Sequence, residues 1–314
     1  MRRILMALSG LAVLWFTTGC GILPVRFERD FTRTAEWHAY QRIIVHTQNG
    51  DVKLAPGEGE LVRIDGHLRA DLITRDDAEK YIDQIEIVMR TEEEDPSTFI
   101  VELKVPRAIQ YKSVGADFNI RVPVACAAEI DTSNGEIHVR KLKDRVVLDS
   151  SNGEITAEDI VGEVHVSTSN GSIEVRTASG SVTADTSNGD IEATNITGDC
   201  ILTTSNGSIE ATEIQGGVRA RSSNGWIDVR ARPEVYGQVA LETSNGRITA
   251  EVPASIKGKM DIRTSNGNVD VQTGSAVLAD IMTTKNRFRA EMNGGGIGCI
   301  QAYSTNGTVR ILCR

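Results

Sequence analysis

The sequence is poor in aromatic residues and has no long apolar run after its N-terminal segment. Phe, Trp and Tyr make up 4% of the 314 residues, which suits a thin core of small and β-branched side chains better than a globular core. A transmembrane helix needs about 20 consecutive apolar residues, and no stretch of that length follows Cys20. We therefore expect everything beyond Cys20 to be soluble.

Basic residues are also in deficit. The chain has 34 Lys and Arg against 43 Asp and Glu, which gives a formal net charge of −9. Nucleic-acid binding needs clustered Lys and Arg that neutralise phosphates, so no nucleic-acid partner is expected. The histidines lack metal-ligand spacing, and no Gly-rich phosphate loop lies between a strand and a helix. The sequence therefore predicts no cofactor and no metal centre.

The first nineteen residues are typical of an export signal. Two arginines precede an apolar stretch over residues 4–16, which is too short to span a bilayer comfortably. Residues 17–20 (Thr-Thr-Gly-Cys) resemble the lipobox of bacterial lipoproteins, in which Cys20 is the lipid-bearing residue. Acyl chains at this position would form a durable membrane anchor. Gly21 is not the aspartate that commonly signals inner-membrane retention, so the resemblance implies the outer membrane. An ordinary secretory signal remains the alternative.

Asn-Gly pairs recur at a fixed interval of 18 residues through the middle of the chain. Further copies follow at looser spacing up to Asn306. A fixed period of this length is typical of a solenoid, in which each repeat buries its apolar face against its neighbours. The evenly spaced copies are at Asn134, Asn152, Asn170, Asn188, Asn206 and Asn224.

Between the turns, apolar and polar residues alternate with the period of a β-strand. The second residue after the Asn-Gly glycine is isoleucine in seven successive repeats, from Ile137 to Ile248, and these side chains should face inward. Glycine also recurs every nine residues from Gly153 to Gly225. We expect these glycines to supply the positive φ of two tight turns in each coil. The sequence thus predicts an all-β, right-handed parallel β-solenoid, a β-roll or flattened β-helix with about 18–21 residues per coil.

The same alternation, extended to the turn, predicts that the asparagines also face inward. A buried amide must be hydrogen-bonded, and a ladder of asparagines achieves this by bonding from one coil to the next. Calcium in these turns is not expected, because the Gly-Gly-x-Gly-x-Asp pattern of calcium-binding rolls is missing. The predicted structural ladder consists of Asn134, Asn152, Asn170, Asn188, Asn206, Asn224, Asn245 and Asn266.

The stretch before the repeats is less regular. We expect residues 20–40 to be a tether and residues 41–125 to form an N-terminal cap with irregular first coils. Residues 76–84 read as one short helix, with acidic residues in its first turn. A solenoid needs capped ends, because an exposed terminal coil offers unpaired strand edges. The solenoid repeats are assigned to residues 126–314.

Several of these features together resemble a known family. The sequence resembles DUF4097 proteins in four features: Val45, the Gly50–Val52 segment, the Asn119–Pro123 segment and the repeated Thr-Ser-Asn-Gly-x-Ile motif. The resemblance covers about residues 43–312. It implies a bacterial β-strand-repeat protein of a kind regarded as a candidate adhesin. It brings no substrate and no catalytic residues with it.

Four acidic residues occupy the same outward position in successive coils and could form a charged column. Carboxylates about 4.8 Å apart on neighbouring strands should repel one another, which raises pKa values or attracts cations. A weak cation-binding face is therefore one interpretation. A solvated acidic face with arginine counter-charges, such as Arg176 and Arg230, is the other. The column comprises Glu174, Glu192, Glu210 and Asp228.

Four cysteines follow Cys20, and an exported protein can form disulfides. Cys126 and Cys200 lie about four coils apart, beyond the reach of about 7 Å that a disulfide requires. They should be buried free thiols. Cys299 and Cys313 are less than one coil apart and could form a disulfide.

The composite prediction is a non-catalytic, lipid-anchored protein of the cell envelope that presents a solenoid surface for adhesion, scaffolding or sensing. Its partners would be the membrane, through the lipid, and a protein or glycan; the oligomeric state stays open. The alternative is an envelope carbohydrate-binding or polysaccharide-degrading β-helix protein, because carboxylate pairs of the kind that glycoside hydrolysis uses are abundant. Regular repeats supply such pairs automatically. Functional features should therefore be sought where the 18-residue step fails, from Arg232 onward.

Overall fold

The computed structural model describes residues 25–37, 40–72, 84–107 and 113–314. Within these ranges the chain is all-β, with no α-helix and no helix that could cross a membrane. The predicted helix at residues 76–84 falls almost wholly outside them. Cys20 and the predicted export signal also lie outside the described residues. The chain divides into two compact units, unit 1 over residues 1–153 and unit 2 over residues 154–314.

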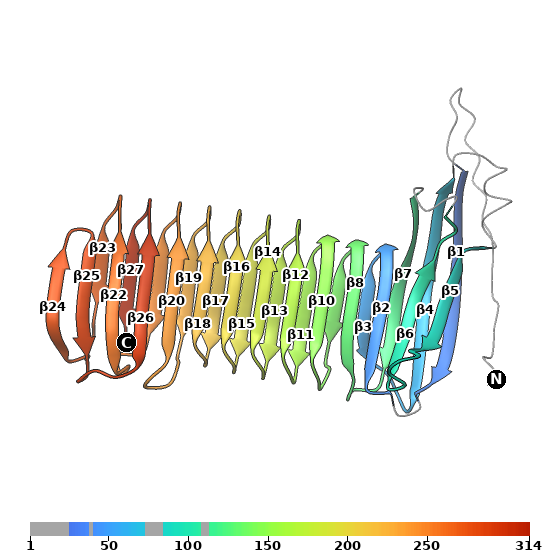
Figure 1. Cartoon of the computed structure of the whole chain (residues 1–314), viewed down its shortest axis with the longest axis horizontal. Helices are drawn as coiled ribbons and strands as arrows, with labels where there is room; N and C mark the ends of the chain where they lie inside the picture. Colours follow the sequence, from blue (N-terminus) through green and yellow to red (C-terminus); the bar gives the residue numbers. More distant parts are fainter. Residues whose placement is uncertain (1–24, 38–39, 73–83, 108–112) are drawn as a thin grey trace, which may run out of the picture. The chain divides into compact units, whose positions relative to one another are not determined.

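Unit 1 contains two sheets (Figure 1), with the strand orders β1-β4-β7-β3-β9 and β10-β8-β2-β6-β5. Strand β4 pairs antiparallel with both β1 and β7, and β5 pairs antiparallel with β6. Strand β2 pairs parallel with β8, and β3 pairs parallel with β9. The strands are β1 Val25–Glu36, β2 Arg42–Asn49, β3 Val52–Pro56, β4 Leu61–Leu72, β5 Glu86–Thr91, β6 Thr98–Lys104, β7 Ser113–Val122, β8 Ala127–Asn134, β9 Ile137–Arg140 and β10 Val146–Asn152.

Strand β1 differs from the sequence prediction. Residues 25–36, which were assigned to a tether, pair with β4 along their whole length. Phe31 of β1 is buried, and its ring meets that of Phe118 edge-on at 5.9 Å between centroids. Phe27, Arg29 and Phe31 lie on the same side of the strand. Because the charged Arg29 separates the two apolar residues, the alternation typical of a strand is hard to recognise in the sequence. The antiparallel strands β1 and β4 end this sheet of unit 1.

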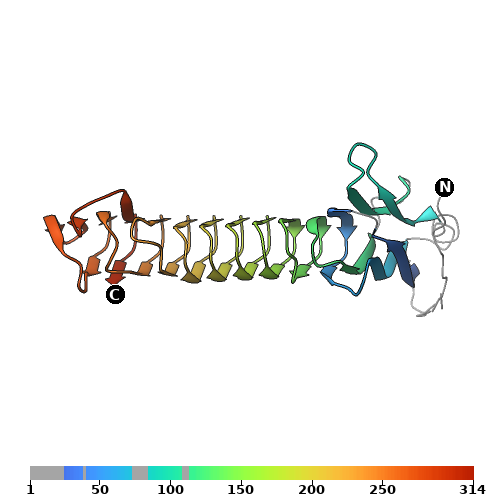
Figure 2. The ribbon, with the colours of Figure 1, turned by 90° about the horizontal axis from the view of Figure 1, so that it is seen from below.

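Unit 2 has two mainly parallel sheets that face each other (Figure 2). We call them sheet A, with the order β11-β13-β15-β17-β19-β21-β27-β23, and sheet B, with the order β24-β25-β22-β26-β20-β18-β16-β14-β12. The strands are β11 Ile155–Ile160, β12 Val164–Thr168, β13 Ile173–Ala178, β14 Val182–Thr186, β15 Ile191–Ile196, β16 Cys200–Thr204, β17 Ile209–Ile214, β18 Val218–Ser222, β19 Ile227–Ala231, β20 Gln238–Thr243, β21 Ile248–Val252, β22 Gly258–Thr264, β23 Val269–Gln272, β24 Leu278–Thr284, β25 Arg287–Met292, β26 Gly298–Ser304 and β27 Val309–Cys313.

The core of unit 2 is built from columns of identical or similar side chains. Ile173 pairs with Ile191 and Ile191 with Ile209 on neighbouring strands, and all three are at most 1% exposed. Sheet B contributes Val182 and Leu202 from the other side, also fully buried. The inward isoleucine column predicted from the repeat is therefore confirmed, and with it the all-β solenoid.

The glycines of these turns have a different role from the predicted one, which was to supply the positive φ. The repeated positive φ values occur at non-glycine residues, 18 residues apart: Asp159, Thr177, Asn195 and Glu213, with φ between 55° and 59°. The Asn-Gly glycines are needed because successive turns stack closely. A Cβ added at Gly189 would overlap the backbone oxygen of Gly171 in the preceding turn, and Gly207 has the same relation to Gly189.

The C-terminal coil lies inside the stack and not at its end. Strand β26 is hydrogen-bonded between β20 and β22, and β27 between β21 and β23. The antiparallel pair β24 and β25 ends sheet B beyond β22 (Figure 1). The order of coils in space therefore departs from their order in the sequence after β21.

The cysteines after Cys20 are all free, so the predicted disulfide between Cys299 and Cys313 is wrong. Both residues belong to one coil, but they differ in orientation. Cys313 is 3% exposed in the core, whereas Cys299 is half-buried and alternates with the inward residue Ile300. Cys126 and Cys200 are buried free thiols, as predicted.

Candidate functional site

The asparagines of the turns form ladders, but exposed ones. Along each ladder, the side-chain amide nitrogen donates to the amide oxygen of the preceding asparagine at 2.8–2.9 Å, and the first amide, that of Asn49, donates to the backbone oxygen of Val114. The prediction that the eight ladder asparagines are buried is wrong, because all eight are exposed, whereas Asn49, which the prediction did not include, is half-buried. In unit 1 the order is Asn49, Asn134, Asn152; in unit 2 it is Asn170, Asn188, Asn206, Asn224, Asn245, Asn306, Asn266.

The buried polar residue of each turn is the Thr or Ser two positions before asparagine. Thr186, Thr204 and Ser222 are at most 7% exposed. Their hydroxyls donate to the backbone oxygens of Gly171, Gly189 and Gly207 in the preceding turns at 2.7–3.0 Å. The inward alternation therefore stops at this hydroxyl residue. Because the amides bond to one another and the hydroxyls bond to the backbone, the Asn-Gly turn is a structural element.

The predicted acidic column exists on the outer face of sheet A. Glu174 is in register with Glu192, Glu192 with Glu210, and Glu210 with Asp228. Burial raises the pKa of Glu174, while its ion pair with Arg176 acts in the opposite direction. Among the described residues, no three His, Cys, Asp or Glu side chains converge closely enough to hold a metal ion. Weak cation binding by this face stays a prediction.

A broad groove of about 1030 Å³ crosses the outer face of sheet A at the end of this column. It lies over β15, β17, β19, β21 and β27, around the point where Arg232 interrupts the repeat. Both carboxylates and arginines line it. Its charged lining comprises Glu210, Glu213, Asp228, Arg230, Arg232, Glu251 and Arg314.

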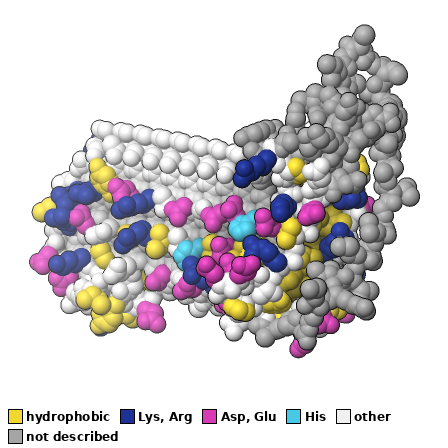
Figure 3. Space-filling model, turned by 45° about the vertical axis from the view of Figure 1, so that its right-hand side comes forward, with side chains coloured by type: hydrophobic (Ala, Val, Ile, Leu, Met, Phe, Trp, Pro, Cys, Tyr) yellow, Lys and Arg dark blue, Asp and Glu magenta, His cyan; other side chains and the backbone are white. Residues whose placement is uncertain are grey.

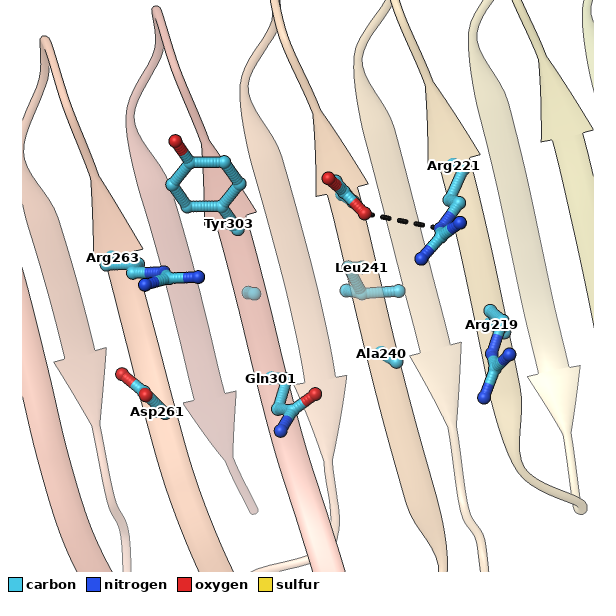
Figure 4. Close-up of a pocket in the computed structure, with 10 residues that line it drawn as sticks. Arg219, Arg221, Ala240, Leu241, Asp261, Arg263, Gln301 and Tyr303 are labelled. Atoms are coloured by element: carbon cyan, nitrogen blue, oxygen red, sulfur yellow. Dashed lines mark ion pairs between the residues drawn. The ribbon is translucent and has the colours of Figure 1, made fainter.

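A second groove, of about 290 Å³, lies on the outer face of sheet B (Figure 4). Its side chains come from four neighbouring strands that are far apart in the sequence: β18, β20, β26 and β22. Arg219 is in register with Ala240, Ala240 with Gln301, and Gln301 with Asp261. The small side chain of Ala240 leaves the hollow between Arg219 and its neighbours. A parallel row contains Arg221, Glu242, Tyr303 and Arg263.

This sheet B groove has an excess of positive charge. Arg221 pairs with Glu242 at 3.2 Å, and the guanidinium of Arg263 lies 4.7 Å from the centroid of the Tyr303 ring. Figure 4 shows Tyr303 between Arg263 and the Arg221 pair. In the space-filling view, Lys and Arg side chains gather toward the β24 end of unit 2 (Figure 3).

Asp261 at the rim of the sheet B groove is neutralised from β25. Arg289 approaches its carboxylate at 2.7 Å and Arg287 at 3.4 Å. The hydrogen bond from Arg289, followed by the positive charges of the two arginines, holds the pKa of Asp261 below its usual value. Two guanidinium groups thus face one carboxylate, which leaves a net positive charge at this rim.

The sheet B groove was not predicted from the sequence. Functional features were expected from Arg232 onward, and both grooves include residues on each side of that point. The missing information was the insertion of β26 next to β20, which brings Gln301 and Tyr303 beside Ala240 and Glu242.

Comparison with known proteins gives one clear match. The family model described as Toastrack DUF4097 matches residues 39–312. No curated protein is similar to the chain at a significant level.

Several solved structures are similar at low identity. A candidate adhesin of Bacteroides fragilis is 15% identical, with 91% of this chain and 97% of that chain covered and a TM-score of 0.34. A candidate lipid binding protein of Parabacteroides distasonis is 14% identical, with 90% of this chain and 96% of that chain covered and a TM-score of 0.43. A candidate adhesin of the same organism is 11% identical, with 90% of this chain and 96% of that chain covered and a TM-score of 0.44. These values are too low for the likeness to bear on function.

Proposed function

The chain belongs to the Toastrack DUF4097 family, and from that premise we propose that it is a non-catalytic protein of the cell envelope. It presents the outer faces of its β-solenoid for adhesion, scaffolding or sensing. One observation supports this most directly: charged side chains stand in register over many coils and border two open grooves on the outer faces of sheets A and B. Such faces offer many equivalent contacts to an extended partner.

The second part of the proposal is a lipid anchor at Cys20, with the outer membrane as its location. It is supported by the lipobox-like residues 17–20 and by Gly21. Labelled palmitate should be incorporated into the full chain, which should sediment with outer-membrane vesicles. Cys20→Ser should abolish both. An unlabelled chain that still sediments with the membrane would contradict the anchor.

A second candidate function is polysaccharide degradation, favoured by one feature of the sheet A groove. Glu210 and Asp228 are directly paired on β17 and β19, and neighbouring strands are about 4.8 Å apart. Retaining glycosidases place two carboxyl groups at a similar separation, about 5–5.5 Å. The same register arises wherever the repeat places acids on successive strands, as for Glu174 and Glu192.

One experiment separates the two functions. The full chain is applied to a glycan array, and reducing ends released from each bound glycan are measured. Binding without release is expected. Release that Asp228→Asn abolishes, while binding persists, would overturn the non-catalytic proposal and establish the alternative.

A further inference from the structure

Basic side chains are concentrated on one part of the outer face of sheet B. The outward positions of β12, β14 and β16 carry no Lys or Arg. From β18 to β25, the outward positions carry six basic residues against three acidic ones, Glu242, Asp261 and Glu291. The basic residues are Arg219, Arg221, Lys259, Arg263, Arg287 and Arg289. This local excess contrasts with the net charge of −9 for the whole chain.

Two of these arginines are available to a ligand. Among the described residues, no carboxylate lies within ion-pair distance of Arg219 or Arg263. They stand on opposite sides of the hollow, three strand intervals apart, which is roughly 14 Å. Both are exposed. Free guanidinium groups form paired, charge-assisted hydrogen bonds with carboxylate, sulfate or phosphate oxygens.

The lining of the sheet B groove argues against a peptide as the ligand. All four strands that form it are internal to the sheet, so their backbone groups are already paired and cannot extend to an added strand. The apolar residues Leu241 and Ala302 face the core and are at most 2% exposed, so no apolar anchor pocket is available. The accessible lining is guanidinium, amide and phenol, the methyl group of Ala240, and two carboxylates, Glu242 and Asp261, each of which is already ion-paired with an arginine.

We infer that the sheet B groove binds an anionic polysaccharide, an inference that rests on the proposed function and specifies its partner. Arg219 and Arg263 bind acidic groups on separate sugar units, and Gln301 hydrogen-bonds to hydroxyls between them. The chain runs across the strands over Ala240. A hydroxyl-rich polymer matches a polar, open groove of this kind, and its repeating charge matches cations held at the strand spacing.

The test measures binding of a fluorescent polygalacturonate oligomer to the full chain by fluorescence anisotropy. Arg219→Ala combined with Arg263→Ala should weaken binding roughly a hundredfold, as expected for two charge-assisted interactions. The matched control combines Arg140→Ala with Arg247→Ala, which removes the same charge from positions outside both grooves. It should change the affinity by less than about threefold.

A second variant tests the space and not the charge. Ala240→Phe keeps every arginine and fills the hollow, and it should weaken binding by about tenfold. Circular dichroism and the thermal midpoint should be unchanged, because Ala240 alternates with the inward residue Leu241 and faces outward.

Three outcomes would overturn the inference. Equal losses in the groove variant and the control would indicate nonspecific charge attraction. Equal competition by poly-glutamate would indicate an acidic-peptide site. No binding of polygalacturonate by the unaltered chain would also overturn it, while glycan-array binding without release would leave the proposed function in place. Release of reducing ends by a chain that binds polygalacturonate in the groove would overturn the proposed function alone.

Discussion

Three residues of the Thr-Ser-Asn-Gly turn, the threonine, the asparagine and the glycine, each make a different contact with the neighbouring coil. In unit 2 the threonine hydroxyl is buried and binds a glycine carbonyl, as Thr204 does with Gly189 at 2.9 Å. The asparagine bonds to its counterpart at the surface, and the glycine lets two backbones approach. These contacts repeat without a ligand. The turn therefore stabilises the stack, and its sequence regularity reflects packing.

The close approach at glycine predicts a large effect from one methyl group. Gly189→Ala should destabilise the protein by about 1–3 kcal/mol, because the added Cβ would overlap the Gly171 backbone and force the turns apart. Thermal unfolding measures this. Ser187→Ala, an exposed position in the same turn, should stay within about 0.5 kcal/mol of the unaltered protein; equal effects at both positions would contradict the stacking argument.

Thr177 has a positive φ of 59°, a conformation that is unfavourable for a β-branched residue and better tolerated by asparagine. Thr177→Asn should stabilise the protein by roughly 1 kcal/mol. Asn195 already occupies the equivalent position in the next coil, also with φ of 59°. Chemical denaturation provides the measurement. Thr194→Asn, on strand β15, should destabilise, since asparagine is unfavourable in a strand.

The thiols differ in reactivity because they differ in burial. Burial raises the pKa of Cys126 and Cys200 to about 12 and that of Cys313 to about 11. Thiolate is the reactive form, so these three should resist alkylation in the folded protein at any pH below that range. Cys299 is half-buried and should react first. Mass spectrometry after iodoacetamide treatment, with and without denaturant, identifies the labelled residues; early labelling of Cys200 would contradict this order.

At the level of elements, the pair β26 and β27 makes two sets of strand contacts where a terminal coil would make one. Val309 of β27 is in register with Ile248 on one side and Val269 on the other. It is fully buried, whereas Val269 in the terminal coil is half-exposed. The inserted coil is therefore part of the core, although it comes last in the sequence.

This position predicts unequal effects of the same substitution. Val309→Ala should destabilise by about 2 kcal/mol, from lost burial and the cavity that remains. Val269→Ala should cost less than half as much, because its side chain is already partly in contact with water. Comparing the two free energies of unfolding checks the argument. Equal values would mean that β27 behaves as a terminal strand.

The sequence predicted the elements better than their arrangement. The isoleucine column from Ile155 to Ile248 followed from a two-residue alternation inside an 18-residue period, and both are local. Asn188 was predicted to be buried because the alternation was extended one step past Thr186, into a turn where strand geometry no longer holds. The sheet B groove was not predictable at this level. It depends on pairing between β20 and β26, which no local pattern encodes.

At the scale of the whole molecule, the net charge conceals a separation of charge in unit 2. The two sheets face each other, so their outer faces point in opposite directions (Figure 2). Sheet A carries the column from Glu174 to Asp228, and sheet B carries the basic cluster around Arg219 and Arg263. Local fields of this kind govern association more than net charge does.

The full chain should therefore bind to a cation-exchange resin at low ionic strength and neutral pH, despite its net charge of −9. Arg219→Ala with Arg263→Ala should shift its elution to markedly lower salt, because retention depends on the local cluster. The elution salt concentration is the measurement. Arg230→Ala with Arg247→Ala provides the control, and an equal shift for both pairs would contradict a localised cluster.

The place of the C-terminal coil has a consequence for the order of synthesis. Ribosomes make β20 to β25 before β26 and β27, yet the later strands must lie between the earlier ones. Until residues 298–313 emerge, β20 and β22 either leave a slot one strand wide or pair with each other in a register that must be undone. Coils up to β21 can assemble as they are made, whereas everything beyond waits for the last strand pair. Unit 2 is therefore built coil by coil up to β21, and β26 and β27 then enter between strands that were made earlier.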